Sequence, residues 1–503
     1  MDVTITPAEM KELERAYMDE SGVPGALLME HAALGVADAL ARRIPGGRAL
    51  FLCGPGNNGG DGYAAARLWQ GRGGRALIWE LPGERRGDAA MNRALAAEVG
   101  IPIENAGDAL PACDAVVDAL FGTGLSHDVT GAAAALIGLV NGSRLPVIAV
   151  DIPSGLDGLT GCACGATIRA AETVTFHRPK PGLFLRDGAA HAGTVTVQPI
   201  LIPAGWGDVD GLRVLHPEDL GRMIPPRAAD SHKGTYGRCV ILAGSPGMAG
   251  AAAFSAMACV RAGAGLTTVL CRESLLPILQ ALAPGAMCLP LPERGGCLTP
   301  EAEEIAAEAL STAAAGCIGP GLGQALDLLP LLRTFSEAEC PVVWDADALN
   351  LLADHDSLLP LPEHHVITPH PGEAARLIGT TIPDVRDNPL STLDSLHDLC
   401  GCAVLLKGAR TLITDGISSY VNLHASPALA KGGSGDVLSG ILTALLARGD
   451  WPTVDTAALA ALIHGLAGIR AARQEGENCV TPQSLIGCVR LDAKDCTTKE
   501  ETA

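Results

Sequence analysis

Strand-like runs alternate with Ala- and Leu-rich stretches along most of this 503-residue chain, and this alternation constrains its fold more than any other feature. The runs rich in Val, Ile and Leu lie at residues 48–53, 75–81, 114–121, 146–152, 238–244, 265–270, 340–347 and 364–369. Strands that alternate with helices form parallel sheets covered by helices. We therefore expect an α/β protein built on parallel sheets.

A segment rich in Pro, Gly and charged residues interrupts the alternation between Ile202 and Arg238. At roughly 150 residues per domain the chain has room for two or three domains, and segments of this composition commonly separate domains. The two halves open alike, with a strand, a Gly-rich turn and an Ala-rich helix, but differ afterwards. We expect two different fused α/β domains, residues 1–212 and 213–495, with an antiparallel hairpin within 404–423 at the end of the second sheet.

The charge balance limits the partners of the chain. It carries 36 Lys and Arg against 56 Asp and Glu, a formal net charge of −20. Such a charge repels nucleic acids and anionic membranes, so we expect neither as a partner. A phosphorylated small molecule is still compatible, because backbone N–H groups and helix ends bind phosphate without net positive charge.

The first residues predict a capped helix beginning after Thr6, with Glu9 completing the cap, and not a secretory signal. Apolar runs elsewhere are shorter than the ~20 residues of a membrane span. The 16 Cys include no Cys-x-x-Cys pair, which favours reduced thiols over zinc sites and disulfides. We expect a soluble cytoplasmic protein.

The turn after residues 48–53 is rich in glycine. Gly54, Gly56 and Gly59 match a dinucleotide-binding fingerprint, and Glu80 lies where an acid would bind the ribose. A tight turn without a ligand is the alternative. The fingerprint does not explain the polar residues of the same turn, which include Asn58.

Polar residues also follow two other strands of the first half, where Asp118, Asp151 and Ser154 end the runs 114–121 and 146–152. Ligands of open α/β sheets bind at the carboxyl ends of the strands, so we expect these residues to converge with the Gly-rich turn. Oxygen groups such as Asn58, Asp118 and Ser154 suit a hard cation better than zinc. The alternative is that each Asp caps the next helix.

Together the motifs CGPGNNGGDG, DALFGTG and DIPSGLDG, preceded by LLMEHAA and followed by HRPKPG, closely resemble the YjeF N-terminal domain, the NAD(P)HX epimerase, over about residues 5–210. The resemblance implies a Rossmann-like fold with a potassium ion held by Asn58, Asp118 and Ser154, and it leaves a redox role as the second choice. It also implies contacts to hydrated nicotinamide dinucleotide from Asn57, Asn58, Gly59, Gly60, Asp61, Gly122, Thr123, Gly124, Leu125, Ser126, His127, Asp128 and Asp151. Of these we expect Asp151 to be catalytic.

In the second half, the sequence KGGSGD places Asp436 just inside an apolar helix after a Gly-rich turn. Turn amides stabilise negative charge on a transferring phosphoryl group, and an Asp there can take a proton from the attacking hydroxyl. An ordinary N-capping Asp is the alternative. No Walker A pattern is present, which excludes a P-loop ATPase.

Two further positions carry chemistry. His370 lies between two prolines beside Glu373, and Lys407 ends a strand where it could meet a nucleotide phosphate. A structural His and a hairpin-edge Lys are the alternatives.

These motifs, with HKGTYGR, AGSPGMAG, GPGLG and WDADALN, resemble the ribokinase-like, ADP-dependent NAD(P)HX dehydratase over about residues 230–490. The resemblance implies that hydrated dinucleotide faces Ala251, Gly321, His370 and Asp436. ADP would face Lys407, Gly408, Ala409, Arg410, Thr411 and Gly435. The segment before the turn, SPALAKGGSGD, departs from the usual pattern at Lys431, where the contacts to the nucleotide would differ.

The resemblance implies a bifunctional enzyme that epimerises R- and S-NAD(P)HX in its first domain and dehydrates the S form in its second. Asp436 would be the base and Mg²⁺ would clamp the phosphates of ADP, or of ATP as in some relatives. We expect NADHX and NADPHX as substrates and a homo-oligomer. The alternatives are a ribokinase-like vitamin or sugar kinase fused to a dinucleotide-binding domain, and a noncatalytic nucleotide-binding protein.

Overall fold

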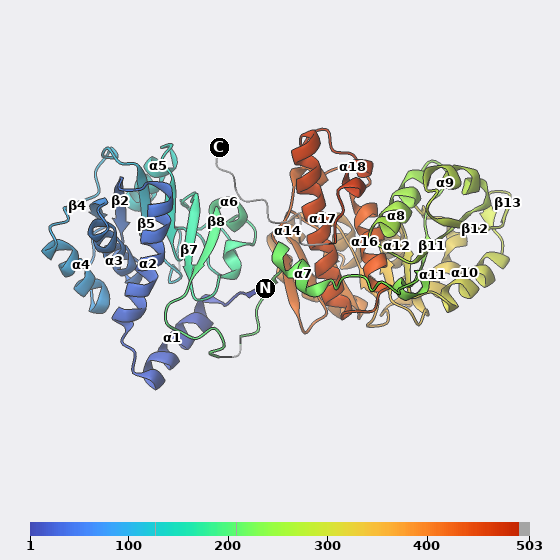
Figure 1. Ribbon diagram of the computed structural model, residues 1–503, viewed down its shortest axis with the longest axis horizontal. Helices are drawn as coiled ribbons and strands as arrows, with labels where there is room; N and C mark the ends of the chain where they lie inside the picture. Colours follow the sequence, from blue (N-terminus) through green and yellow to red (C-terminus); the bar gives the residue numbers. More distant parts are fainter. Residues whose placement is uncertain (126, 208, 492–503) are drawn as a thin grey trace. The chain divides into compact units, whose positions relative to one another are not determined.

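The computed structural model describes residues 1–125, 127–207 and 209–491 and divides by its internal contacts into two compact units. The first spans Asp2–Leu212 and the second begins at Arg213. Both are α/β units, as the alternation of strands and helices predicted (Figure 1).

The first unit is built on a wholly parallel sheet in the order β4-β3-β2-β5-β6-β7-β8. Its strands are β2 (Arg48–Cys53), β3 (Arg75–Glu80), β4 (Ile103–Asn105), β5 (Ala115–Ala119), β6 (Val147–Val150), β7 (Glu172–Phe176) and β8 (Thr194–Gln198). The strand-like runs of the sequence did not include β4, β7 or β8, although the alternating Thr and Val of ETVTF in β7 and TVTVQ in β8 are typical of strands.

Helices cover both faces of this sheet. They are α1 (Pro7–Ser21), α2 (Gly25–Arg43), α3 (Asn57–Gly71), α4 (Gly87–Glu98), α5 (Gly131–Asn141) and α6 (Gly188–His191). Phe51 of β2 belongs to the apolar cluster that α1 to α4 also line, whereas Leu50 and Leu52 belong to a second cluster with α5. This period-two alternation buries both faces of the strand, as expected in a parallel sheet.

The second unit has a larger sheet. Its hydrogen-bonded strands follow the order β9-β20-β19-β18-β17-β16-β15-β10-β11-β12. Its strands are β9 (Arg213–Val214), β10 (Arg238–Leu242), β11 (Leu266–Arg272), β12 (Met287–Leu291), β15 (Ala315–Ile318), β16 (Val342–Trp344), β17 (Val366–Ile367), β18 (Ala403–Leu406), β19 (Thr411–Thr414) and β20 (Ser419–Asn422). The small hairpin β13 (Glu293–Arg294) and β14 (Cys297–Leu298) lies outside it.

In this sheet the neighbouring strands β18, β17, β16, β15, β10, β11 and β12 are all parallel to one another. Strand β19 is antiparallel to both β18 and β20. The antiparallel hairpin predicted within 404–423 is therefore confirmed. The expectation that it ends the sheet is wrong, because β9 pairs in parallel with β20 beyond it.

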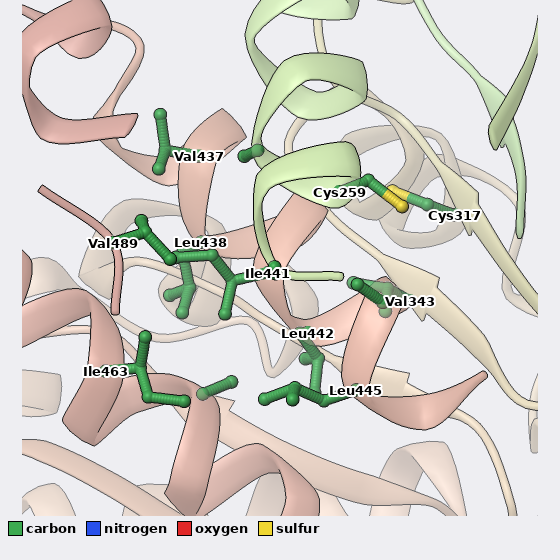
Figure 2. Packing of buried hydrophobic residues seen from close by; sticks show 14 of the residues in the cluster. Cys259, Cys317, Val343, Val437, Leu438, Ile441, Leu442, Leu445, Ile463 and Val489 are labelled. Atoms are coloured by element: carbon green, nitrogen blue, oxygen red, sulfur yellow. The ribbon is translucent and has the colours of Figure 1, made fainter. Parts of the chain in front are cut away.

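The helices of the second unit include a long central pair, α16 (Ser434–Leu446) and α17 (Thr453–Glu475). The others are α7 (Leu220–Met223), α8 (Ala249–Arg261), α9 (Leu276–Leu282), α10 (Glu301–Ser311), α11 (Leu329–Ser336), α12 (Asp347–Asp354), α13 (Pro371–Leu377), α14 (Ile382–Asp387), α15 (Pro389–Cys400) and α18 (Pro482–Gly487). Ile441 and Leu445 of α16 are fully buried, in a cluster with Cys259 of α8 and Ile463 of α17 (Figure 2). The helix that carries Asp436 is thus fixed by packing on almost every side.

Helix α17 is long and apolar enough to cross a membrane by length and composition, yet 78% of its most apolar window is buried inside the protein. Its side chains belong to the core just described. At the start of the chain, the predicted cap of α1 is confirmed, since Thr6 and Glu9 form a reciprocal capping box.

Candidate active sites

The glycine turn after β2 depends on close backbone approach. A Cβ at Gly54 would lie 1.8 Å from the Leu120 carbonyl oxygen, and one at Gly59 would lie 2.0 Å from the Gly54 carbonyl oxygen. Gly56 has open space around its Cβ position, so the first and third glycines of the fingerprint are the ones that the packing requires. The turn is thereby fixed against the end of β5.

Asp118 and Ser154 meet at the ends of β5 and β6, as the sequence predicted. The Ser154 hydroxyl donates to the Asp118 carboxylate at 2.6 Å, and the Ser154 amide donates at 2.8 Å. Asp118 is fully buried, and burial raises its pKa to about 6. A third donor is the amide of Leu120 at 3.3 Å, and within the described ranges no cationic side chain is paired with this carboxylate. A buried carboxylate with neutral donors alone is a favourable ligand for a cation.

Asn58 lies beside the same carboxylate-bearing strand end. A Cβ at Gly122 would lie 3.2 Å from its amide oxygen, and its amide nitrogen is buried without a hydrogen-bond partner among the described residues. Oxygen donors from Asn58, Asp118 and Ser154 are therefore present in one region. The Phe121 carbonyl, 3.1 Å from the Ser154 hydroxyl, adds a fourth oxygen.

Asp151 follows β6 with a left-handed backbone, φ 63°, which is uncommon outside glycine. Its carboxylate accepts a 2.6 Å hydrogen bond from the ammonium of Lys180, which is 1% exposed, and a 3.0 Å bond from Thr175. Lys180 also donates to Thr175 and to the Phe176 carbonyl. All three donors of the ammonium are thus engaged, and Lys180 fixes the carboxylate.

Two more acids interact with this pair. Burial, followed by the nearby charge of Asp151, raises the pKa of Asp61 well above its usual value. Burial also raises the pKa of Glu14, and the charge of Lys180 partly offsets this increase. The cluster therefore combines two carboxyl groups whose pKa values are raised with an Asp151 that is paired to a cation.

The remaining predicted residues of the first domain lie on the surrounding turns. Asn57 is exposed at the start of α3, Gly59 and Gly60 are buried inside it, and His127 and Asp128 are exposed. In the turn from Gly122, the Leu125 amide donates to the Gly122 carbonyl, and Thr123 lies near Gly158. Gly124 is exposed. Ser126 lies outside the described residues.

Glu80 has partners that account for it without a ribose. It accepts from Arg93 at 2.8 and 3.0 Å and from Tyr63 at 3.0 Å, and hydrogen bonding from Arg93 lowers its pKa. A redox dinucleotide site is thus disfavoured at this strand end.

In the second unit, Asp436 lies in the first turn of α16, after Gly433 with φ 92°. Burial, followed by the charge of Asp345, raises its pKa to about 6, against the opposite effect of Lys407. His464 of α17 fixes the turn through Ser434 at 3.0 and 3.2 Å, and burial lowers the pKa of His464 to about 4, so it is neutral. A half-buried carboxyl with this pKa can exchange a proton near neutral pH.

Lys407, which was predicted to meet the nucleotide, points to the same turn. Its ammonium lies 2.7 Å from Asp345 and 3.8 Å from Glu373, and a Cβ at Gly435 would lie 3.5 Å from it. Burial works against its charge, but Asp345 and Glu373 raise its pKa. The ammonium is therefore charged and beside the glycine turn.

The residues predicted to face the dinucleotide come together in part. A Cβ at Gly321, φ 58°, would lie 2.8 Å from the Cβ of Ala251, so the GPGLG turn touches α8. Helix α8 also contacts α16, where Ser255 donates to the Asp436 carbonyl at 3.0 Å. His370 caps α13, its Nδ1 accepting from the amides of Gly372 and Glu373.

The segment after Lys407 forms the β18–β19 turn. Gly408 and Ala409 are exposed, Arg410 donates to the Leu423 carbonyl, and Thr411 donates to the Gly408 carbonyl at 3.5 Å. Lys431 binds the carbonyls of Asn478 and Val480 at 2.7 Å each, so its ammonium has local partners.

Sequence reasoning missed Lys180, Glu14, Asp345 and Ser439. HRPKPG and WDADALN were singled out as motifs, which marks the segments of Lys180 and Asp345, but only the fold shows what each side chain contacts. Among residues 1–125, 127–207 and 209–491, no group of three or more His, Cys, Asp or Glu is arranged to hold a metal.

Fold and sites together define a two-domain α/β enzyme whose second domain is ribokinase-like. That domain resembles the solved structure of a ribokinase-like superfamily protein from Enterococcus faecalis, with 29% identity, a TM-score of 0.50, and coverage of 55% of this chain and 94% of that one. Residues 25–182 match the family described as YjeF-related protein N-terminus, and residues 239–490 match NAD(P)H-hydrate dehydratase.

Similarity to curated proteins extends over nearly the whole chain. The bifunctional NAD(P)H-hydrate repair enzyme of Moorella thermoacetica is 38% identical, covering 96% of this chain and 95% of that protein. Those of Coxiella burnetii and Escherichia coli are 34% and 37% identical, covering 98% and 84% of this chain and 99% and 81% of those proteins. The chain belongs to the family of bifunctional NAD(P)H-hydrate repair enzymes, with an epimerase domain followed by a dehydratase domain.

Proposed function

We propose that residues 1–212 interconvert the R and S forms of NADHX and NADPHX, and that residues 213–495 dehydrate the S form with ADP as phosphoryl donor. The observation that carries this proposal is the half-buried Asp436 in a glycine turn beside the Lys407 ammonium. Residues 492–495 lie outside the described part of the chain.

Dehydration needs a better leaving group than hydroxide. Asp436 accepts the proton of the ring hydroxyl, whose oxygen attacks the terminal phosphorus of ADP while the bond to the departing AMP breaks. The phosphate then leaves with the electrons of the carbon–oxygen bond, and loss of a ring proton restores NAD(P)H. The amides around Gly435 and the charge of Lys407 stabilise the negative charge of the transferring group.

The residues around Asp436 have distinct roles in this proposal. Ala251, Gly321 and His370 face the hydrated dinucleotide, and Lys407–Thr411 with Gly435 face ADP. The contact between Gly321 and Ala251 supports a common surface for the first group. Mg²⁺ would be held by the nucleotide phosphates and would supply further charge neutralisation there.

In the first domain, a potassium ion fits Asn58, Asp118 and Ser154. The buried Asp118 carboxylate has only neutral hydrogen-bond donors, and the Asn58 amide oxygen lies beside Gly122 near the same strand end, so oxygen ligands for a cation are present together. Asp151, fixed by Lys180, is the catalytic carboxylate, and Asn57–Asp61 with Gly122–Asp128 hold the substrate.

The partners that we propose are small molecules alone. The net charge of −20 supports this, because it disfavours nucleic acids and anionic membranes. We further propose a cytoplasmic homo-oligomer.

The test is to incubate the purified protein with mixed R- and S-NADHX and ADP, following the absorbance of restored NADH together with AMP and phosphate. The proposal requires all three products in equal amounts. A stable phosphoester detected by mass would indicate a vitamin or sugar kinase instead, and nucleotide binding without turnover would indicate a noncatalytic protein.

A further inference from the structure

Asp345 is a buried carboxylate that the proposed reaction does not use. It follows β16, is 1% exposed, and donates its own amide proton to the Ile318 carbonyl at 3.1 Å. A Cβ at Gly319 would lie 1.8 Å from its carbonyl oxygen, so the GPGLG turn covers it. At this depth the carboxylate is shielded from solvent, and one of its oxygens lies 3.9 Å from the Cβ position of Gly435.

Both oxygens of Asp345 have specific partners from distant segments. One accepts from the Lys407 ammonium at 2.7 Å, and the other accepts from the Ser439 hydroxyl of α16 at 2.6 Å. Ser439 lies one helical turn after Gly435 and also donates to its carbonyl at 3.1 Å. One carboxylate therefore connects the end of β18 to the start of the catalytic helix.

We propose that Asp345 is a positioning residue of phosphoryl transfer, which holds the Lys407 ammonium at the Gly433–Gly435 turn where the transferring phosphoryl group is bound. The proposal rests on the proposed dehydratase function. It assigns Lys407 a contact to the reacting phosphoryl group and not only a general contact to ADP, because the Lys407 ammonium is 3.5 Å from the Cβ position of Gly435. A lysine with four freely rotating bonds needs such an anchor to present its charge at one point.

The charged groups that face Asp436 allow the idea to be tested by pH. These groups are Asp345 at the end of β16, Lys407 at the end of β18 and Asp347 of α12. Glu373 of α13 contacts Lys407, while the His464 imidazole of α17 and the Cys317 thiol of β15 are uncharged. Asp345 thus acts on Asp436 directly and through the cation that it anchors.

Replacing Asp345→Asn removes a negative charge near Asp436, together with the anchor of Lys407. Loss of this charge lowers the pKa of Asp436, so the acid limb of kcat for dehydration should move down by about half a pH unit or more. We expect kcat to fall about tenfold or more, with KM for S-NADHX within about twofold of wild type. Lys407→Met removes the cation, so its acid limb should move up instead.

Ser439→Ala is the matched control. It removes the hydrogen bond to the second oxygen of Asp345 without a change of charge, so its acid limb should stay in place. Thermal melting and the epimerase activity of the same full-length chain check folding. If Asp345 acts through Lys407, the double variant with Asp345→Asn and Lys407→Met should lose no more activity than Lys407→Met alone.

Losses that multiply in the double variant, or an unmoved acid limb in Asp345→Asn, would overturn the proposal. Should Asp345→Asn fail to fold, Lys407→Met provides the test. If its acid limb of kcat does not move upward, the Lys407 charge lies away from Asp436 and the proposal is wrong. Failure of the function proposed above is recognised separately, as wild-type protein that releases no AMP from ADP in the presence of S-NADHX.

Discussion

The Lys180 ammonium lies 2.6 Å from the Asp151 carboxylate, and the Lys180 side chain is only 1% exposed. The backbone of Asp151 has a φ of 63°. The ion pair offsets the cost of burying either charge alone, which reaches several kcal/mol per ion. The charge of Asp151 also acts on Asp61 of α3, whose pKa is raised by burial and then by this charge. The left-handed backbone is the kind of local strain that persists where packing fixes it.

Removing the cation should therefore disable the first domain. Lys180→Met keeps the length of the side chain but leaves a carboxylate without its partner, which costs about 3 kcal/mol or more for a buried pair. We expect epimerase activity to fall at least tenfold and the first domain to melt at a lower temperature, as measured by calorimetry. Dehydratase activity, measured on S-NADHX in the same preparation, is the control, and unchanged epimerisation would contradict the assignment of Asp151.

Asp118 should control the potassium dependence of epimerisation. Asp118→Ala removes the one charge among the proposed ligands, so the potassium concentration for half-maximal activity should rise at least tenfold. Because the pKa of Asp118 is raised to about 6, its carboxylate is protonated below that pH, and wild-type protein should need more potassium there. Titration of activity with KCl at pH 5.5 and 7.5 measures both effects. A variant with wild-type potassium dependence would place the cation elsewhere.

Asp436 should act as the base in the dehydratase. Asp436→Asn preserves shape but cannot accept the proton, so dehydration should fall by about 10² to 10⁴ while epimerisation persists. The wild-type pKa of about 6 means that the base is ionised above this pH and protonated below it. The rate should therefore be level near pH 7 and fall about tenfold per unit below pH 6. Near-normal dehydration in the variant would remove Asp436 from this role.

Much of the fold could be predicted from local sequence. The buried run Arg48–Cys53 is a strand because its Ala, Leu, Phe and Cys residues follow one another without polar alternation, and Thr6 with Glu9 caps α1 by chemistry that is complete within one helical turn. The meeting of Asp118 and Ser154 followed from a general rule, since parallel strands present their carboxyl ends at one edge.

The rest of the sites depends on long-range contacts. Lys180 and Asp151 are 29 positions apart, Lys407 and Asp345 are 62 apart, and Ser439 and Asp345 are 94 apart. Their contacts follow from the strand order, in which β16 and β18 flank β17, and from the packing of α16. Spacing along the chain does not indicate which of such distant residues are in contact. The sequence could therefore identify the motifs but could not predict the contacts between them.

The packing of α8 on α16 should be sensitive to one methyl group. A Cβ at Gly440 would lie 2.2 Å from the Ser255 carbonyl, which is backbone and cannot rotate away. Gly440→Ala should separate the helices that carry Ala251 and Asp436, with a stability loss of about 1–3 kcal/mol. Thermal unfolding of the second domain measures this. The matched control is Gly487→Ala at the end of α18, where the Cβ position is open, and equal melting of both variants would contradict the close approach.

The two domains should work when separated. Contacts divide the chain between Leu212 and Arg213, and each unit has its own sheet and apolar core. Each is also larger than the size at which a core becomes self-sufficient. We expect residues 1–212 to epimerise NADHX without any adenine nucleotide, and residues 213–503 to dehydrate the S form with ADP while leaving R material to spontaneous conversion.

Mixing the two fragments should restore complete clearance of an R,S mixture, at a rate set by the slower fragment. The measurement is the absorbance of restored NADH for each fragment, for the mixture and for the intact chain at equal concentrations. The intact protein is the reference for both activities. A fragment that precipitates, or that loses its own activity while the intact chain retains it, would show that the domains depend on each other for structure and that the boundary at residue 212 is misplaced.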